Sequence, residues 1–238
     1  MNTSLTWTHP RNNSTNRYPW FSDMCGTDTI NKTVFDYGGC SGNLLYFSNG
    51  AISENKYTSL DVGKACIDNG RTEFPNSTFI HYDRFNWSYN TKGTIDLPFP
   101  EIDKKQDIIW AYSVFTHTDF AGFVEAVKWF TQFDYEKIVI SYLDINCKET
   151  IKYFIDKRIK DYGSCIEFEY GHAITYFVDN HQLLKNNISV EPFECKHFLA
   201  FYNEEFLIDY FATINISASV KKQYSDNGSY IPFLIIER

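Results

Sequence analysis

The sequence predicts an α/β domain built on a doubly wound, mostly parallel sheet. The first observation is a series of short apolar runs, most of which end at a glycine or an aspartate. The second is spacing: four runs end at residues 37, 60, 82 and 113, and gaps of 23, 22 and 31 residues suit right-handed crossovers between parallel strands. The third is helical periodicity in segments that connect the runs.

The predicted elements follow in chain order. Residues 1–32 lack periodicity and form an N-terminal arm with one short helix. Strands are expected at 33–37, 56–60, 78–82, 107–113, 137–143, 173–178, 197–202 and 231–237. Helices are expected at 119–132, 148–162 and 204–212, and Gly163 is the expected stop of the second.

The helix at 119–132 has the clearest pattern. Its apolar side chains recur at helical spacing and form one stripe: Phe120, Phe123, Val124, Val127 and Phe130. Thr118 is the expected N-cap, and Asp119 suits the first turn. By contrast, the connection 91–106 contains one glycine and two prolines, so we expect it to be mostly loop.

We expect a single domain over residues 1–238, because no repeat or low-complexity linker divides the chain. Within it, residues 1–32 form the arm and residues 33–162 the cofactor-binding core. Residues 163–238 are expected to supply substrate-side strands and a lid.

Composition excludes several classes of function. Hydrophobic residues make up 43% of the chain, which rules out wholesale disorder. With 22 Lys and Arg against 30 Asp and Glu, the net charge of −8 argues against binding to nucleic acid or to anionic membranes. Apolar runs are too short for a membrane span, and the polar segment 1–16 has no signal-peptide core. We therefore expect a cytoplasmic location.

The six cysteines predict no metal site. None forms a C-x-x-C pair, and no Cys/His group has zinc spacing. The chain is long enough to build a core without disulfide staples, so we expect reduced thiols.

A glycine-rich turn follows the first predicted strand, in the segment Asp36-Tyr37-Gly38-Gly39-Cys40-Ser41-Gly42. A dinucleotide fingerprint that starts at Gly38 needs glycine at positions 40 and 43, where this chain has Cys40 and Asn43. This argues against a nicotinamide-dependent oxidoreductase. An acidic residue followed by glycine at +2, +4 and +6 fits better, although Cys40 misses it. A purely structural turn is the alternative.

Two carboxylates follow the next two strands. Asp61 comes at the end of the second strand, where a carboxylate can accept both hydroxyl hydrogens of a ribose. Asp83 comes at the end of the third strand, where it can equally serve as a turn or helix cap. Open α/β sheets bind ligands at the carboxyl ends of their strands, which is where both residues are expected.

These residues resemble the class I S-adenosylmethionine-dependent methyltransferases. The resemblance runs from about residue 32 to 144, roughly half of the chain. D-Y-G-G-C-S-G at 36–42 looks like the family's first motif, and 56–61 like its second strand with the ribose-binding acid. F-I-H-Y-D-R-F-N-W-S-Y-N-T-K-G at 79–93 looks like the third strand and its loop. L-P-F at 97–99 with S-V-F-T-H at 113–117 is similar to the fourth strand of one subgroup.

The resemblance implies a seven-stranded sheet with one antiparallel strand near the end, and S-adenosylmethionine as cofactor. It also implies roles for named residues. The glycine turn would meet the methionine part, Asp61 the ribose, Asp83 and Arg84 the adenine, and the residues after strand four the methyl end. The implied cofactor-binding set is Asp36, Gly38, Gly39, Gly42, Asp61, Asp83, Arg84, Tyr112 and Ser113.

Methyl transfer requires alignment of the acceptor and removal of its proton. His117 is the titratable candidate at this edge, and its unperturbed pKa near 6.5 suits a base. The alternative is a hydrogen bond that ties strand four to the next helix. Asp119 is a second candidate, and its alternative is a first-turn helix acid.

We therefore expect a methyltransferase that acts on a small polar metabolite, by O-methylation of a sugar, sugar-nucleotide or other precursor of a bacterial surface polysaccharide. We expect a small-molecule substrate as the partner. A second copy of the chain, in a homodimer, is the other candidate partner. Methyltransferases of nucleic-acid bases show N-P-P-Y or D-P-P-Y after strand four, where this chain has Ala111-Tyr112-Ser113-Val114. The alternative function is a catalytically inactive partner protein with the same fold, which Cys40 favours.

Overall fold

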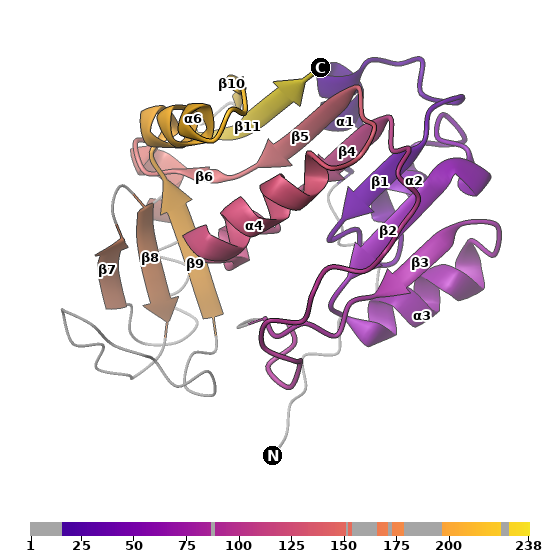
Figure 1. Cartoon of the computed structure of the whole chain (residues 1–238), viewed down its shortest axis with the longest axis horizontal. Coiled ribbons are helices and arrows are strands. Elements are labelled where there is room, and N and C mark those ends of the chain that lie inside the picture. The colour runs from indigo at the N-terminus through magenta and orange to yellow at the C-terminus, as the bar shows by residue number, and fades with distance from the viewer. Residues whose placement is uncertain are drawn as a thin grey trace.

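The computed structural model describes residues 16–86, 89–150, 152–153, 166–170, 173–178, 197–224 and 229–238. Within these residues, the largest element is a seven-stranded sheet with the order β10-β11-β5-β4-β1-β2-β3 (Figure 1). Its strands are β1 (Val34–Tyr37), β2 (Tyr57–Asp61), β3 (Thr78–His81), β4 (Ile108–Ala111), β5 (Lys137–Ser141), β10 (Ser219–Tyr224) and β11 (Tyr230–Glu237).

The strand directions confirm the predicted doubly wound, mostly parallel sheet. Strands β1 to β5 pair in parallel, and β11 pairs antiparallel with both β5 and β10. Only β11 therefore runs against the others. Parallel strands that are covered on both faces need apolar side chains throughout. The four residues of β4 are accordingly all buried, as are four of the five residues of β5.

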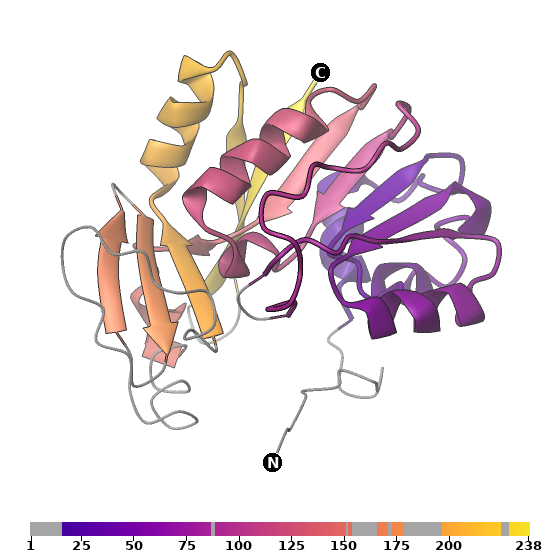
Figure 2. The same cartoon turned by 60° about the horizontal axis from the view of Figure 1, so that its bottom comes forward.

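Helices cover both faces of this sheet (Figure 2). One face packs against α4 (Phe120–Phe130) and α6 (Glu204–Thr213). The other packs against α1 (Tyr18–Cys25), α2 (Asn43–Phe47) and α3 (Lys64–Glu73). The predicted stripe on α4 is confirmed, since Phe123, Val127 and Phe130 are fully buried. Two short 3₁₀ helices, η2 (Glu54–Lys56) and η3 (Phe115–His117), precede β2 and α4.

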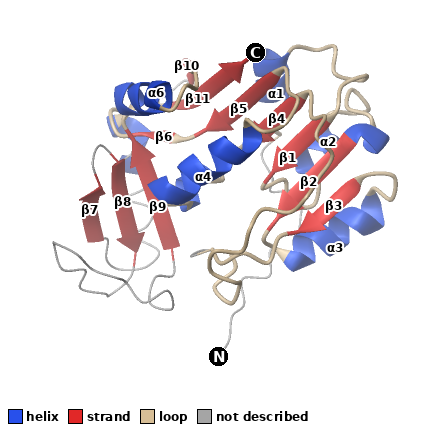
Figure 3. Cartoon of the chain, in the orientation of Figure 1, coloured by secondary structure: helices blue, strands red, loops and turns tan. Residues whose placement is uncertain are grey.

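A second, four-stranded sheet lies beside the first, in the order β6-β9-β8-β7 (Figure 3). Its strands are β6 (Leu143–Asp144), β7 (Ile166–Tyr170), β8 (Ala173–Val178) and β9 (His197–Tyr202). The segments 173–178 and 197–202 are therefore strands, as predicted, but they form a separate sheet that was not expected. Strands β6, β7 and β10 were missed as well. The second sheet starts directly after β5, and β9 packs against η3. It consequently borders the carboxyl ends of the parallel strands.

Three predicted boundaries were wrong. Strand β4 ends at Ala111, not at residue 113, because Ser113 has a left-handed φ of 60° and donates its N–H to the Ser141 side chain. Strand β5 ends at residue 141, because the next two strand residues pair with β9. The N-cap of α4 is Asp119 instead of Thr118, since the Asp119 carboxylate accepts the N–H of Gly122.

The connection 91–106 contains no helix. Most of the helix predicted at 148–162, its stop at Gly163, and much of the proposed lid lie outside the described residues, although residues 148–150 are helical. Among the described helices, none combines the length and the apolar character that crossing a bilayer requires.

Candidate functional site

The glycine loop leaves β1 and passes close to three neighbouring side chains. The N–H of Gly38 donates to the carbonyl of Leu60 at 2.7 Å, which joins the loop to β2. Gly38 has a φ of 77°, and a Cβ there would lie 2.2 Å from Val114 Cγ2. A Cβ on Gly39 would lie 2.6 Å from the Ser59 hydroxyl and 2.7 Å from the Asp36 carboxyl. Both positions therefore require glycine for steric reasons.

Cys40 occupies the position where the family pattern expects glycine. Its φ is 52°, in the left-handed region that glycine adopts most easily. Gly42, two residues on, has a φ of 81° and forms the N-cap of α2. The cysteine thus adopts the backbone conformation expected of a glycine, and the loop continues through it.

Asp61 is the last residue of β2, and its carboxylate connects two loops. Its Oδ2 accepts the N–H of Cys40 at 2.9 Å, and its Oδ1 accepts the N–H of Gly63 at 2.7 Å. Burial raises the pKa of Asp61 above its usual value, and these two N–H groups act in the opposite direction. Asp61 and the glycine loop, 21 residues apart in sequence, therefore form one hydrogen-bonded unit.

Asp36 lies next to Gly39 of this loop. Its side chain is buried, and its Oδ2 accepts the hydroxyl of Tyr57 at 2.5 Å. Burial raises the pKa of Asp36 to about 7, which the Tyr57 hydrogen bond and the charge of Arg17 partly oppose. The predicted residues Asp36, Gly39 and Asp61 are thus brought together.

Arg17 is a candidate that the sequence analysis missed. Its guanidinium carbon lies 4.1 Å from the centre of the Tyr112 ring, and Trp20 stacks on the same tyrosine at 5.4 Å. Its Nε is buried and has no hydrogen-bond partner among the described residues. Arg17 precedes α1 in an arm without periodicity, so no sequence signal marked it. The fold brings a cation to the end of β4.

Tyr112 and Ser113 directly follow β4 instead of ending it. Tyr112 is half-buried between Trp20 and Trp110. Ser113 accepts a hydrogen bond from the Thr116 hydroxyl on its carbonyl, at 2.9 Å. Both residues therefore lie at the carboxyl edge of the sheet. They are close to the glycine loop, because the next residue, Val114, packs against Gly38.

Asp83 and Arg84 are engaged in local contacts after β3. The carboxylate of Asp83 accepts a hydrogen bond from Asn90 at 2.9 Å. The guanidinium of Arg84 binds Glu125 of α4 and the Tyr82 hydroxyl. These side chains hold the loop that follows β3.

His117 lies at the end of η3, and its side chain is largely buried. Its Nε2 is 3.2 Å from the Tyr89 hydroxyl, and the two rings meet edge to face at 5.1 Å. Tyr202 of β9 donates its hydroxyl to the carbonyl of Thr118 at 2.7 Å. The imidazole therefore lies between the loop after β3 and the second sheet. Asp119, two residues on, is exposed and caps α4.

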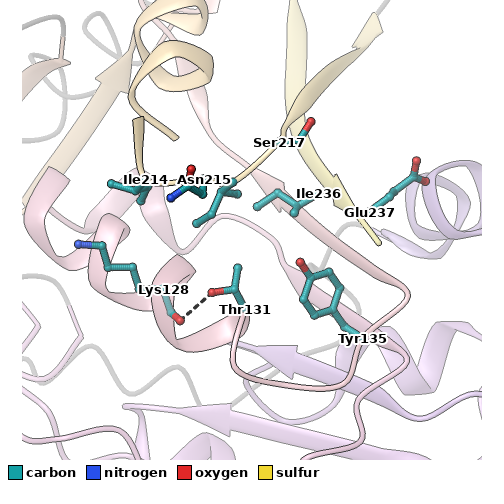
Figure 4. Close-up of a pocket in the computed structure, with 9 residues that line it drawn as sticks. Lys128, Thr131, Tyr135, Ile214, Asn215, Ser217, Ile236 and Glu237 are labelled. Carbon is teal, nitrogen blue, oxygen red and sulfur yellow. Dashed lines mark hydrogen bonds between the residues drawn. The ribbon is translucent and has the colours of Figure 1, made fainter. Parts of the chain in front are cut away.

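Within the described ranges, no three His, Cys, Asp or Glu side chains are grouped closely enough to hold a metal ion. A pocket of about 400 Å³ is lined by Lys128, Tyr135, Asn215 and Glu237 among others (Figure 4). Glu237 pairs with Lys137, the first residue of β5, so this pocket lies at the amino edge of the sheet. The glycine loop and Asp61 are at the opposite edge.

Comparison with known proteins supports the fold. No protein-family model matches the sequence. Among solved structures, an S-adenosylmethionine-dependent methyltransferase from Clostridium acetobutylicum matches with a TM-score of 0.55 and 11% identity, covering 95% of this chain and 94% of that one. The chain has the fold of the Rossmann-like methyltransferases.

Two further structures with this methyltransferase fold were solved with bound ligands. The glycopeptide N-methyltransferase MtfA, complexed with sinefungin, matches with a TM-score of 0.55 and 10% identity over 94% of this chain and 93% of that one. Magnesium protoporphyrin IX methyltransferase from Synechocystis, with bound S-adenosylhomocysteine, matches with a TM-score of 0.51 and 10% identity over 93% and 80%. At these identities the similarity establishes the shared fold. The subgroup suggested by S-V-F-T-H is not supported by these matches.

Proposed function

We propose that the chain is a methyltransferase that uses S-adenosylmethionine. The observation that carries this proposal is the hydrogen bond between Cys40 of the glycine loop and Asp61, at the carboxyl edge of a sheet with the methyltransferase strand order. A loop that lets backbone approach a ligand, beside a carboxylate able to accept ribose hydroxyls, is the arrangement that nucleoside cofactors require.

The residues present fit this cofactor on three counts. Close packing of Gly39 against Asp36 and Ser59 holds the backbone of the loop beside Asp61, where a ribose would bind. Asp61 has lone pairs beyond the two that accept N–H groups. The buried Nε of Arg17 has no hydrogen-bond partner among the described residues, so it is available to bind the carboxylate of a ligand.

Each residue then has a defined task. Bound S-adenosylmethionine would supply an activated methyl group. Asp61 would bind the ribose hydroxyls, and the backbone of Gly38 and Gly39 would lie against the methionine part. Arg17 would pair with the methionine carboxylate. His117, held by Tyr89, would take the proton from the acceptor.

We further propose that the acceptor is a hydroxyl of a small polar metabolite, such as a sugar or sugar-nucleotide used for a surface polysaccharide. The net charge of −8 supports a small acceptor over nucleic acid. The second sheet supports it as well, because β9 packs against η3 and borders the edge where His117 lies. We keep Asp83 and Arg84 as proposed residues on the adenine side of the cofactor, because they hold the loop that follows β3.

A catalytically inactive partner protein is the second candidate, and Cys40 in place of glycine is the observation that favours it. The left-handed φ of Cys40 weakens this alternative, because the loop keeps the conformation that the glycine would give it. Binding and turnover measurements separate the two candidates.

The first test is calorimetric titration with S-adenosylhomocysteine and, separately, with NAD. We expect binding of the former and none of the latter. Asp61→Asn keeps the shape of the side chain but removes its charge, and should weaken binding by about 2 kcal/mol, which is roughly 30-fold. Asp68→Asn, on the exposed surface of α3, is the matched control. Unchanged affinity in Asp61→Asn, or tight NAD binding, would contradict the proposal.

The second test concerns the acceptor. The protein is incubated with labelled cofactor and a panel of nucleotide sugars, free sugars, amino acids, phenols and transfer RNA. We expect label in a sugar or sugar-nucleotide. Label confined to transfer RNA or to protein would overturn the proposed acceptor class. Cofactor binding without transfer to any acceptor in the panel would favour the inactive partner protein.

A further inference from the structure

Two thiols meet where the glycine loop contacts α3. The Sγ atoms of Cys40 and Cys66 lie 2.8 Å apart, and both cysteines are free thiols. Cys40 is half-buried at the turn of the loop, and Cys66 is buried in the first turn of α3. They are 26 residues apart in sequence, so the fold itself creates the pair.

We propose that Cys40 and Cys66 are a modification site: they form a reversible intramolecular disulfide that fastens the glycine loop to α3. An S–S bond is about 2.05 Å long, so the two sulfurs need to approach by less than an ångström. The backbone on both sides is held by one carboxylate, because the N–H groups of Cys40 and of Gly63, the residue before α3, both donate to Asp61.

The two thiols differ in acidity and in exposure, and thiol–disulfide exchange depends on both properties. The hydrogen bond between the two sulfurs lowers the pKa of the Cys40 thiol below its usual value and raises the pKa of the Cys66 thiol. Cys40 is also the more exposed of the two. It is therefore the attacking thiolate, and Cys66 is the resolving thiol.

The oxidant is a small disulfide of the glutathione class. The Cys40 thiolate attacks one sulfur of oxidised glutathione, forms a mixed disulfide and releases one glutathione thiolate, which takes up a proton. The Cys66 sulfur, after losing its proton, attacks the Cys40 sulfur and displaces the second glutathione. Two protein thiols and one oxidised glutathione thus give one protein disulfide and two reduced glutathiones.

The remaining described cysteines lack such a partner sulfur. Cys25 lies in α1, and burial raises the pKa of its thiol to about 12. The sulfur of Cys147 is buried against the Thr150 hydroxyl at 3.0 Å. Among the described cysteines, oxidation is therefore directed to the glycine loop, and this inference stands independently of the proposed function.

The test equilibrates the full chain in glutathione buffers of increasing oxidised fraction, then blocks free thiols and digests with trypsin. Lys56 and Lys64 separate the two cysteines, so reduced protein yields peptides 33–56 and 65–71 singly alkylated. We expect these two peptides to be joined by one disulfide in oxidising buffer and released by dithiothreitol. Separate alkylation of both at the most oxidising ratio, a lasting glutathione adduct on Cys40, or pairing of either with another cysteine would overturn the proposal.

A stability measurement supplies the second readout. Closing a loop of this length should raise the Tm of the oxidised wild type by roughly 5–10 °C over the reduced form. Cys40→Ser and Cys66→Ala should abolish this difference, whereas Cys25→Ser should retain it. Equal Tm values for oxidised and reduced wild type would contradict the disulfide. No cofactor is added, so the result is independent of methyltransferase activity.

Discussion

The backbone N–H of Cys40 donates to Oδ2 of Asp61 at 2.9 Å, and this bond joins the loop after β1 to the end of β2. The bond depends on the left-handed conformation of Cys40, whose φ is 52°. A residue that departs from the glycine pattern therefore still delivers its N–H to the carboxylate. The loop and the carboxylate form one preorganised unit, and substitutions in either are expected to affect both.

Gly39→Ala should damage this unit through a steric clash. The added Cβ would lie 2.6 Å from the Ser59 hydroxyl and 2.7 Å from the Asp36 carboxyl, both on neighbouring strands. Overpacking of this kind should lower the free energy of unfolding by about 1–3 kcal/mol, as measured by denaturant titration. Binding of S-adenosylhomocysteine should be lost.

Gly50→Ala is the control for this substitution. Its φ is 85°, but a Cβ there meets nothing within 4 Å, so only backbone strain of about 1–2 kcal/mol is expected. Its cofactor binding should remain intact. Normal binding by Gly39→Ala would show that the loop can move away from Asp36, contrary to the preorganised unit of loop and carboxylate.

Arg17→Ala should selectively weaken the binding of ligands that carry the methionine carboxylate. If the Arg17 guanidinium, whose Nε is buried, pairs with the methionine carboxylate, S-adenosylhomocysteine should bind roughly 10- to 100-fold more weakly to the variant. Methylthioadenosine lacks that carboxylate, so its affinity should be unchanged. Calorimetry with both ligands distinguishes this role from general loss of packing, which would weaken both. Lys64→Ala, an exposed lysine of α3, is the charge-matched control.

The sequence predicts the parallel strands well because each is an apolar run that ends at a distinctive residue. Val34–Tyr37 ends at the glycine turn, and Tyr57–Asp61 ends at the carboxylate. Long-range partners are harder to predict. Nothing local marks that Arg17 reaches Tyr112 or that Cys66 meets Cys40, since both contacts arise only when distant segments pack together. The second sheet was missed for the same reason: a two-residue strand such as Leu143–Asp144 has no periodicity of its own.

His117→Ala tests whether this imidazole is the proposed base. Turnover should fall by about 10²-fold or more, while the affinity for S-adenosylhomocysteine stays the same. The alternative is that His117 only holds Tyr89, whose hydroxyl lies 3.2 Å from Nε2. Tyr89→Phe removes that contact and keeps the imidazole, so it should retain most activity. Wild-type turnover in His117→Ala would show that the residue has a structural role only.

Asp119→Asn separates helix capping from catalysis at Asp119, the second candidate catalytic residue. Asparagine caps a helix about as well as aspartate, so the stability of α4 should be preserved. Activity should then fall only if the Asp119 carboxylate itself takes part in the reaction. We expect the fall to be smaller than that of His117→Ala, because the Asp119 carboxylate is already bound to the N–H of Gly122.

Asp36→Asn should make the protein more stable at high pH and leave it little changed at low pH. Burial raises the pKa of Asp36 from 3.8 to about 7, so the folded chain holds a proton that the unfolded chain has already lost between these values. Stability of the wild type therefore falls as pH rises through this window, because the folded state binds more protons than the unfolded state. Asparagine accepts the Tyr57 hydroxyl without a charge and removes this dependence.

The measurement is the free energy of unfolding of both proteins at pH 5 and pH 8. The advantage of Asp36→Asn over the wild type should grow by about 2–3 kcal/mol between these two values. Asp68→Asn provides the control, because Asp68 is exposed on α3 and its pKa is lowered by Lys64. That variant should gain no stability as pH rises. An Asp36→Asn advantage that is equal at both pH values would mean that the Asp36 carboxyl is ionised in the folded protein throughout this range.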